Sequence, residues 1–122
     1  MAKKENILLR FVLIVIAVLV FTFFDWIVHS SSAYLAVPGY YFKHKIIYGT
    51  LWACIASLVF RKVEIKKQAF LITAITVGLL QLNYIYLGFP LLFHLIIVTE
   101  HFFFMYLATY FALKMLKKLN TA

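Results

Sequence analysis

The chain has 122 residues, of which 66% are hydrophobic and only 13% are charged. A soluble domain is about half apolar and a quarter charged, so this composition indicates an integral membrane protein. The formal net charge is +8, but the basic residues form short clusters between apolar segments instead of one polar face with interleaved aromatic side chains. We therefore expect no nucleic-acid partner, and the lipid bilayer is the expected surrounding of the chain.

Four segments are long and apolar enough to cross a bilayer, which takes about 20 helical residues. They cover approximately residues 6–30, 41–60, 69–87 and 90–113. The last connection is short, with Gly88 placed to end one helix and Pro90 placed to open the next. Short connections favour antiparallel neighbours, so we predict an all-α integral membrane fold: a four-transmembrane-helix antiparallel bundle, one domain over residues 1–122.

The distribution of basic residues predicts the orientation of this bundle. Two basic residues, Lys43 and Lys45, fall on one side of the predicted membrane. The other ten fall on the opposite side: Lys3, Lys4, Arg10, Arg61, Lys62, Lys66, Lys67, Lys114, Lys117 and Lys118. Cytoplasmic segments are enriched in Lys and Arg, so we expect both termini to be cytoplasmic in a multi-pass protein of the plasma or inner membrane.

The ionisable side chains within the spans lie near the predicted outer side. Each costs roughly 2.5–3.5 kcal/mol at the centre of a membrane helix, so their grouping calls for an explanation. At about 1.5 Å rise per residue, Asp25 and His94 lie roughly 6–9 Å below their outer helix ends, while His29 and His44 are shallower. Glu100 and His101 lie about 15 Å deep on the same scale.

These depths predict two groups. Asp25 and His29 are four residues apart and share a helix face, so we expect an upper metal site of Asp25, His29, His94 and His44. Imidazole and carboxylate ligands suit a divalent transition metal such as zinc, copper or iron. The deeper pair, Glu100 and His101, is the candidate catalytic pair that would move protons.

Two short stretches resemble known families. The spacing of Asp25, His29 and His44 resembles the Asp/His/His copper ligand set of the membrane C-type subunit of particulate methane and ammonia monooxygenases, with a slightly different second spacing. This resemblance implies copper at these three residues. The stretch "TEHFFFMY", residues 99–106, resembles the acidic-then-aromatic motif of small membrane carotene cyclases, although the proline and second acid of that motif are missing.

Several functions are compatible with this pattern, and whether the protein is an enzyme is left open. A catalytic metal site would act on a lipid or isoprenoid substrate that enters from the bilayer. An electron carrier would place haem between His29 and His94 as axial ligands. A third hypothesis is a non-enzymatic subunit of a larger membrane complex, or a homo-oligomeric proton or ion transporter that uses Glu100 and His101. A purely structural Asp–His pair is the simplest alternative.

Overall fold

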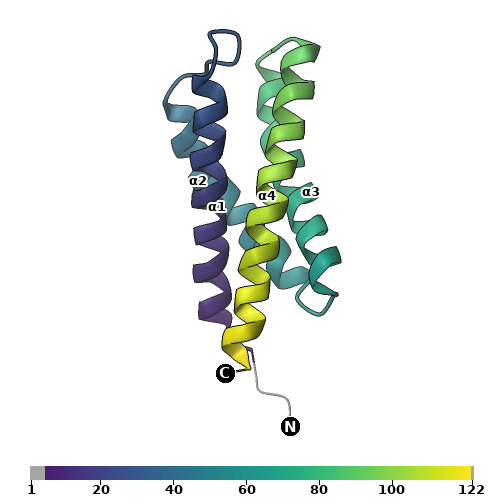
Figure 1. Cartoon of the computed structure of the whole chain (residues 1–122). Coiled ribbons are helices and arrows are strands. Elements are labelled where there is room, and N and C mark those ends of the chain that lie inside the picture. Colours follow the sequence, from purple (N-terminus) through teal and green to yellow (C-terminus); the bar gives the residue numbers. More distant parts are fainter. Residues whose placement is uncertain (1–4, 122) are drawn as a thin grey trace.

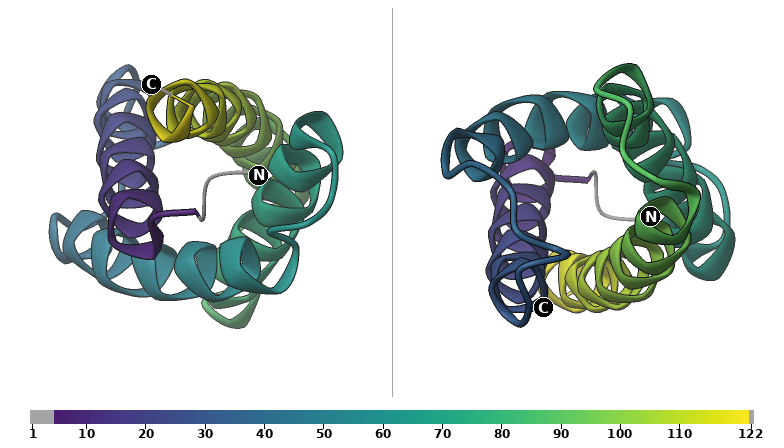
Figure 2. Two further views of the ribbon diagram at one scale, coloured as in Figure 1. Left: turned by 90° about the horizontal axis from the view of Figure 1, so that it is seen from below. Right: turned by 90° about the horizontal axis from the view of Figure 1, so that it is seen from above.

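The computed structural model describes residues 5–121. It contains four helices, α1 (Ile7–Ser30), α2 (Tyr40–Val59), α3 (Ile65–Tyr86) and α4 (Leu91–Asn120), and no strand within the described residues. Successive helices run in opposite directions, and the start of α1 and the end of α4 lie at the same end of the molecule (Figure 1). Each helix contacts its neighbours in sequence, and α1 also contacts α4, so the four helices form a closed ring (Figure 2). The all-helical fold class is confirmed.

Local sequence explains where the helices begin and end. At the start of α1, the side chain of Asn6 accepts a hydrogen bond from the backbone N–H of Leu9 at 3.1 Å, as an N-cap residue does. The chain leaves α3 through Gly88, which has a φ of 78°, and its N–H donates to the carbonyl oxygen of Ile85 at 3.1 Å. Pro90 is the N-cap residue of α4. The expected roles of Gly88 and Pro90 are therefore confirmed.

Two helices extend beyond their apolar stretches. α3 begins at Ile65, four residues before the expected span, and α4 continues to Asn120, seven residues past residue 113. The added segments contain five lysines and two leucines, which have high helix propensity, so the backbone remains helical where its side chains become polar.

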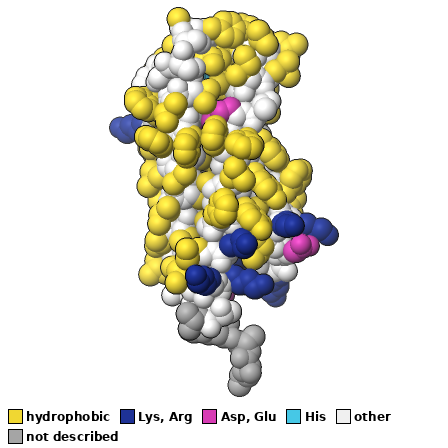
Figure 3. Space-filling model, viewed as in Figure 1, with side chains coloured by type: hydrophobic (Ala, Val, Ile, Leu, Met, Phe, Trp, Pro, Cys, Tyr) yellow, Lys and Arg dark blue, Asp and Glu magenta, His cyan; other side chains and the backbone are white. Residues whose placement is uncertain are grey.

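Three of the described helices, α1, α3 and α4, are long and apolar enough to cross a membrane. α2 is not among them, because it has Lys43, His44 and Lys45 in its first two turns. Hydrophobic side chains cover most of the visible surface, and basic side chains gather near the end where the termini lie (Figure 3). Lys3 and Lys4, which contribute to the predicted orientation, lie outside the described residues. A four-span arrangement and its orientation remain predictions.

Buried residues follow a regular helical stripe that places polar side chains at both ends of the core. On α1 they recur every three or four residues, as Arg10, Ile14, Val18, Phe21, Asp25 and His29. The middle of this stripe packs into an apolar cluster that includes Ala53, Ile72 and Met105. The ends of the stripe carry charge, so the bundle has one polar layer near the termini and another in its opposite half.

Candidate metal centre

Asp25 is the centre of the polar layer in the half of the bundle remote from the termini. It is completely buried, and its two carboxylate oxygens have different partners. Oδ1 lies 2.8 Å from Nε2 of His101 on α4 and 3.3 Å from Nε2 of His29 one turn further along α1. Oδ2 accepts a hydrogen bond from the ammonium group of Lys45 on α2. Three helices therefore supply polar partners to one carboxylate.

Asp25, His29 and His101 together have the geometry of a potential metal site. One ligand atom from each residue lies within 4.8 Å of the other two, and all three residues are buried. Ligand atoms around a tetrahedral zinc ion are roughly 3.3 Å apart, given bonds of about 2.0–2.2 Å, so small side-chain adjustments would suffice. Two imidazoles and one carboxylate suit zinc, copper or iron and leave at least one coordination position open.

His29 is held in the tautomer that a metal ligand requires. Its Nδ1–H donates a hydrogen bond to the carbonyl oxygen of Leu35 at 2.5 Å. A carbonyl can only accept, so the proton of the neutral ring is on Nδ1 and Nε2 presents a lone pair toward Asp25. The loop after α1 supports this contact, because the Leu35 backbone N–H donates to the hydroxyl of Ser32 at 3.3 Å.

His101 is fully buried and makes two competing contacts through one nitrogen. Its Nε2 lies 2.8 Å from Oδ1 of Asp25 and 3.2 Å from Nζ of Lys45. In a neutral ring, Nε2 either donates to Asp25 or accepts from Lys45, and cannot do both. Nδ1 of His101 has no hydrogen-bond partner among the described residues. Unlike that of His29, the tautomer of this ring is therefore not fixed by a backbone carbonyl among the described residues.

The ammonium group of Lys45 contacts two of the three candidate metal ligands, Asp25 and His101. Its side chain is 2% exposed. Besides Asp25 and His101, the ammonium group donates to the hydroxyl of Tyr84 at 3.0 Å. That hydroxyl lies 3.4 Å from Nε2 of His29, to which it can donate in turn. The ammonium neutralises the carboxylate that a metal would also need, so a metal ion would compete with Lys45 for Asp25.

Lys45 is not among the site residues predicted from the sequence, where it counts only as a basic residue on the outer side. The structure shows that this lysine is buried and does not belong to the surface charge. The spacing of residues on α2 does distinguish this lysine. The buried face of α2 includes four residues at intervals of four: Tyr41, Lys45, Gly49 and Ala53. A lysine on a stripe of small residues is close enough to the neighbouring helices to pair with an acid across the bundle.

The structure does not bring His94 or His44 to the group around Asp25. Nδ1 of His94 lies 2.7 Å from the amide nitrogen of Gln81 on α3. His44 is exposed on α2 beside the rings of Tyr40 and Tyr48, at centroid distances of 5.5 and 6.0 Å. The aromatic contacts of His29 are with Phe42, Tyr84, Phe93 and His101. Metal binding by His94 and His44, and haem ligation by His29 and His94, remain predictions that these contacts do not support.

The helix ends explain why His101 takes the place expected for His94. Asp25 is five residues from the end of α1, whereas His101 is ten residues from the start of α4. Since these side chains touch, α4 starts roughly 7 Å beyond the end of α1, at 1.5 Å rise per residue. Depths measured from each helix end therefore placed Asp25 and His101 in separate groups, although they share one layer.

Glu100 lies beside this cluster, and its side chain is largely buried, with both carboxylate oxygens covered. Its Oε2 is 3.6 Å from Nε2 of His101, and neither carboxylate oxygen has a hydrogen-bond partner among the described residues. Leu95, Ile96, Thr99 and Phe103 form a shallow outer groove with it. Glu100 thus connects an apolar surface with the buried polar layer.

A small cavity between α2 and α3 leads to the cluster from the side. Its volume is about 240 Å³. The lining residues are mostly aromatic or polar: Tyr41, His44, Lys45, Tyr48, Trp52, Leu79, Leu80, Asn83 and Tyr84. Lys45 and Tyr84 belong both to this cavity and to the polar cluster, so a molecule in the cavity would lie next to the site.

In comparisons with protein-family models, curated protein sequences and solved structures, no match was found.

Proposed function

We propose that this chain is a four-span membrane protein that binds one divalent transition-metal ion through Asp25, His29 and His101. The observation that carries the proposal is the convergence of three buried ligand atoms within 4.8 Å of one another. The fixed tautomer of His29 adds to it, because a backbone carbonyl behind a histidine is a common support of metal ligands. Zinc, copper and iron all suit this set of ligands.

The membrane orientation is part of this proposal. The start of α1 and the end of α4 lie at one end of the bundle, and the described basic residues near them support a cytoplasmic location for that end (Figures 1 and 3). The polar cluster would then lie in the outer half of a plasma or inner membrane. The cavity between α2 and α3 would give a lipid or isoprenoid molecule a lateral route to the metal.

Zinc binding by the purified protein tests the proposal. We expect one zinc ion per chain after removal of adventitious metal and incubation with zinc, measured by elemental analysis. His101→Ala should lose most of this metal, because no neighbouring imidazole replaces the ligand. His94→Ala is the matched control on the same helix and should retain the metal. Absence of zinc from the wild type, or equal metal content in wild type and His101→Ala, would contradict the proposal.

A second candidate function is proton transfer, and a separate observation favours it. The unpaired carboxyl of Glu100 lies between an outer groove and a chain of polar groups that runs through His101, Asp25, Lys45 and Tyr84. Buried ionisable groups in contact are the usual components of proton relays in membrane proteins. Four helices enclose little space, so such a carrier would work as a homo-oligomer or as a subunit of a larger complex.

Proton flux into proteoliposomes would separate the two candidates. A proton carrier should acidify the vesicle interior under an imposed gradient without added metal, and Glu100→Gln should abolish that flux. Wild-type vesicles with the same permeability as protein-free vesicles would eliminate the second candidate.

A further inference from the structure

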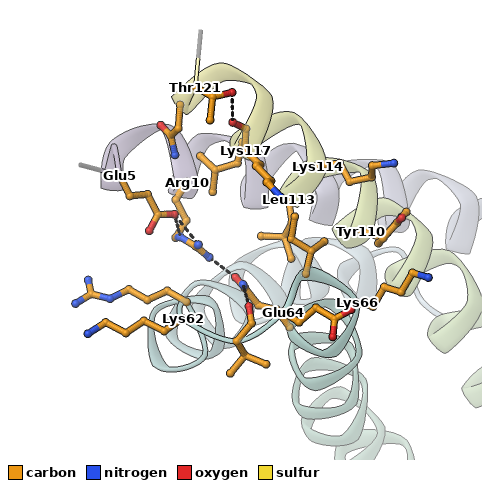
Figure 4. Close-up of a pocket in the computed structure, with 16 residues that line it drawn as sticks. Glu5, Arg10, Lys62, Glu64, Lys66, Tyr110, Leu113, Lys114, Lys117 and Thr121 are labelled. Atoms are coloured by element: carbon orange, nitrogen blue, oxygen red, sulfur yellow. Dashed lines mark hydrogen bonds and ion pairs between the residues drawn. The ribbon is translucent and has the colours of Figure 1, made fainter. Parts of the chain in front are cut away.

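A second polar layer surrounds a cavity near the termini, away from the metal centre. The cavity has a volume of about 570 Å³ and lies between α1, the α2–α3 connection and the last turns of α4 (Figure 4). Its lining includes six basic side chains: Arg10, Arg61, Lys62, Lys66, Lys114 and Lys117. Only two acidic residues, Glu5 and Glu64, line the same cavity. Four positive charges are therefore not balanced within the lining, which favours an anionic ligand.

Arg10 forms the floor of this cavity and is held rigidly. It is 3% exposed, an unusual burial for a charged side chain. Its Nη1 donates to the hydroxyl of Ser57 at 2.8 Å and to the side-chain oxygen of Gln68 at 2.6 Å. The partners come from α2 and α3, so three helices fix the plane of the guanidinium group. The guanidinium group of Arg10 is therefore held in one orientation, unlike the mobile charge of an exposed arginine.

The other edge of the Arg10 guanidinium is directed at Glu5. Nε donates to Oε1 of Glu5 at 2.6 Å, and Nη2 lies 2.5 Å from the same oxygen. This edge is the part of arginine that binds carboxylate and phosphate oxygens in a two-pronged way. Glu5 precedes α1, and its side chain is 26% exposed. An anion with a higher negative charge can therefore displace the Glu5 carboxylate from Arg10 without unwinding a helix.

We propose that this cavity binds a phosphate group, with Arg10 at its base and the surrounding lysines at its rim. The carboxylate of Glu5 takes the place of the phosphate when no ligand is bound. Basic pockets between membrane helices on the cytoplasmic side bind the headgroups of anionic lipids. Tyr110, Leu113 and Leu116 add an apolar wall to the cavity. The phosphate can belong to an anionic phospholipid or to a soluble phosphate ester, and the experiment below distinguishes these sources.

The chain offers a matched pair of double variants for this test. Lys62→Gln/Lys117→Gln removes two exposed charges that line the cavity. Lys67→Gln/Lys118→Gln removes two exposed charges from neighbouring positions that do not line it. Both variants lower the net charge equally, so a difference between them reports the cavity itself.

Each protein would be titrated in neutral detergent with phosphatidylglycerol, with phosphatidylcholine and with inorganic phosphate, and bound ligand would be counted by native mass spectrometry. We expect the cavity variant to bind phosphatidylglycerol roughly 30-fold more weakly than wild type, at about fivefold per lysine. The control variant should bind like the wild type, and phosphatidylcholine should bind weakly to all. Glu5→Gln should bind the anion more tightly, because the competing carboxylate is gone.

Binding of inorganic phosphate alone, with the same dependence on the two double variants, would support the proposal and assign a soluble ligand. Equal loss in both double variants would overturn it, because binding would then follow net charge and not the cavity. Failure of wild type to bind either anion would overturn it as well. None of these measurements depends on metal binding at Asp25.

Discussion

Asp25 on α1 and Lys45 on α2 form an ion pair inside the bundle, and neither side chain is more than 2% exposed. Removal of one member of a buried pair leaves an uncompensated charge, which costs about 3–5 kcal/mol. Replacement of both members by uncharged residues is often close to neutral. The pair therefore predicts a strong dependence of each residue on the other.

Lys45→Met should lower the free energy of unfolding by about 3–5 kcal/mol in the absence of metal, because the carboxylate of Asp25 loses its cation. Asp25→Asn/Lys45→Met should recover most of this loss. Denaturation in detergent micelles, followed by circular dichroism, measures both. Lys43→Met is the control, since Lys43 is exposed and its change should stay within about 0.5 kcal/mol. Equal loss in Lys45→Met and Lys43→Met would show that the ion pair has no structural role.

The same Lys45→Met change should raise the affinity for zinc by about tenfold or more. At an effective dielectric constant of about 20, two positive charges roughly 4 Å apart repel by about 4 kcal/mol, which exceeds the roughly 1.4 kcal/mol of a tenfold change in affinity. Zinc should also restore the stability that the variant lost, because a ligand that binds only the folded state stabilises it. Calorimetric titration with zinc measures the affinity. An unchanged or lower affinity would mean that Lys45 does not compete with metal for Asp25.

Glu100→Gln should leave the zinc content unchanged, whereas Asp25→Asn should lower it greatly. Asp25 supplies the oxygen that both histidines approach, whereas the Glu100 carboxylate contacts only His101, at 3.6 Å, and does not belong to the group of three converging ligand atoms. Elemental analysis of the two variants and the wild type shows which of the two carboxylates binds zinc. If Glu100→Gln lost the metal and Asp25→Asn retained it, Glu100 and not Asp25 would be the carboxylate ligand.

Cysteine labelling tests the orientation. In a Cys54→Ser background, Ser31→Cys should react with a membrane-impermeant reagent added outside the cell, and Lys66→Cys should react only after permeabilisation. The basic residues near the termini are the reason for this expectation. The opposite labelling pattern would place the polar cluster in the inner half of the membrane.

Much of the helical fold could be predicted from the sequence, because the signals are local. Gly88 and Pro90 determine the α3–α4 connection through their own backbone preferences, and the structure places both as expected. Asp25 and His29 could also be paired correctly, because a spacing of four residues puts both on one helix face. Their separation in the structure, 3.3 Å between Oδ1 and Nε2, agrees with this prediction.

Contacts between helices were harder to predict, because they depend on how far each helix is shifted along the bundle. That shift is determined by loop conformation and by packing, so depth counted from a helix end did not bring His101 to Asp25. Lys45 shows a second difficulty. Lysine near a helix end normally indicates membrane topology, and only the spacing of four from Tyr41, Gly49 and Ala53 distinguishes this one. The Leu35 carbonyl that orients His29 depends on a loop fold, for which the sequence offers no periodic signal.

The two polar layers share one helix, and this affects how the protein is made. Arg10 and Asp25 are both on α1, whereas their partners Ser57 and Lys45 are on α2, which follows α1 in the chain and is synthesised after it. Until α2 is synthesised, both charges lack these partners in the membrane, at a cost below the roughly 2.5–3.5 kcal/mol of a charge at the centre of a membrane helix, because each lies near one end of α1. In the proposed four-span topology, α1 should therefore enter the membrane as a hairpin together with α2, and a nascent chain that stops before Lys45 should be retained at the insertion machinery.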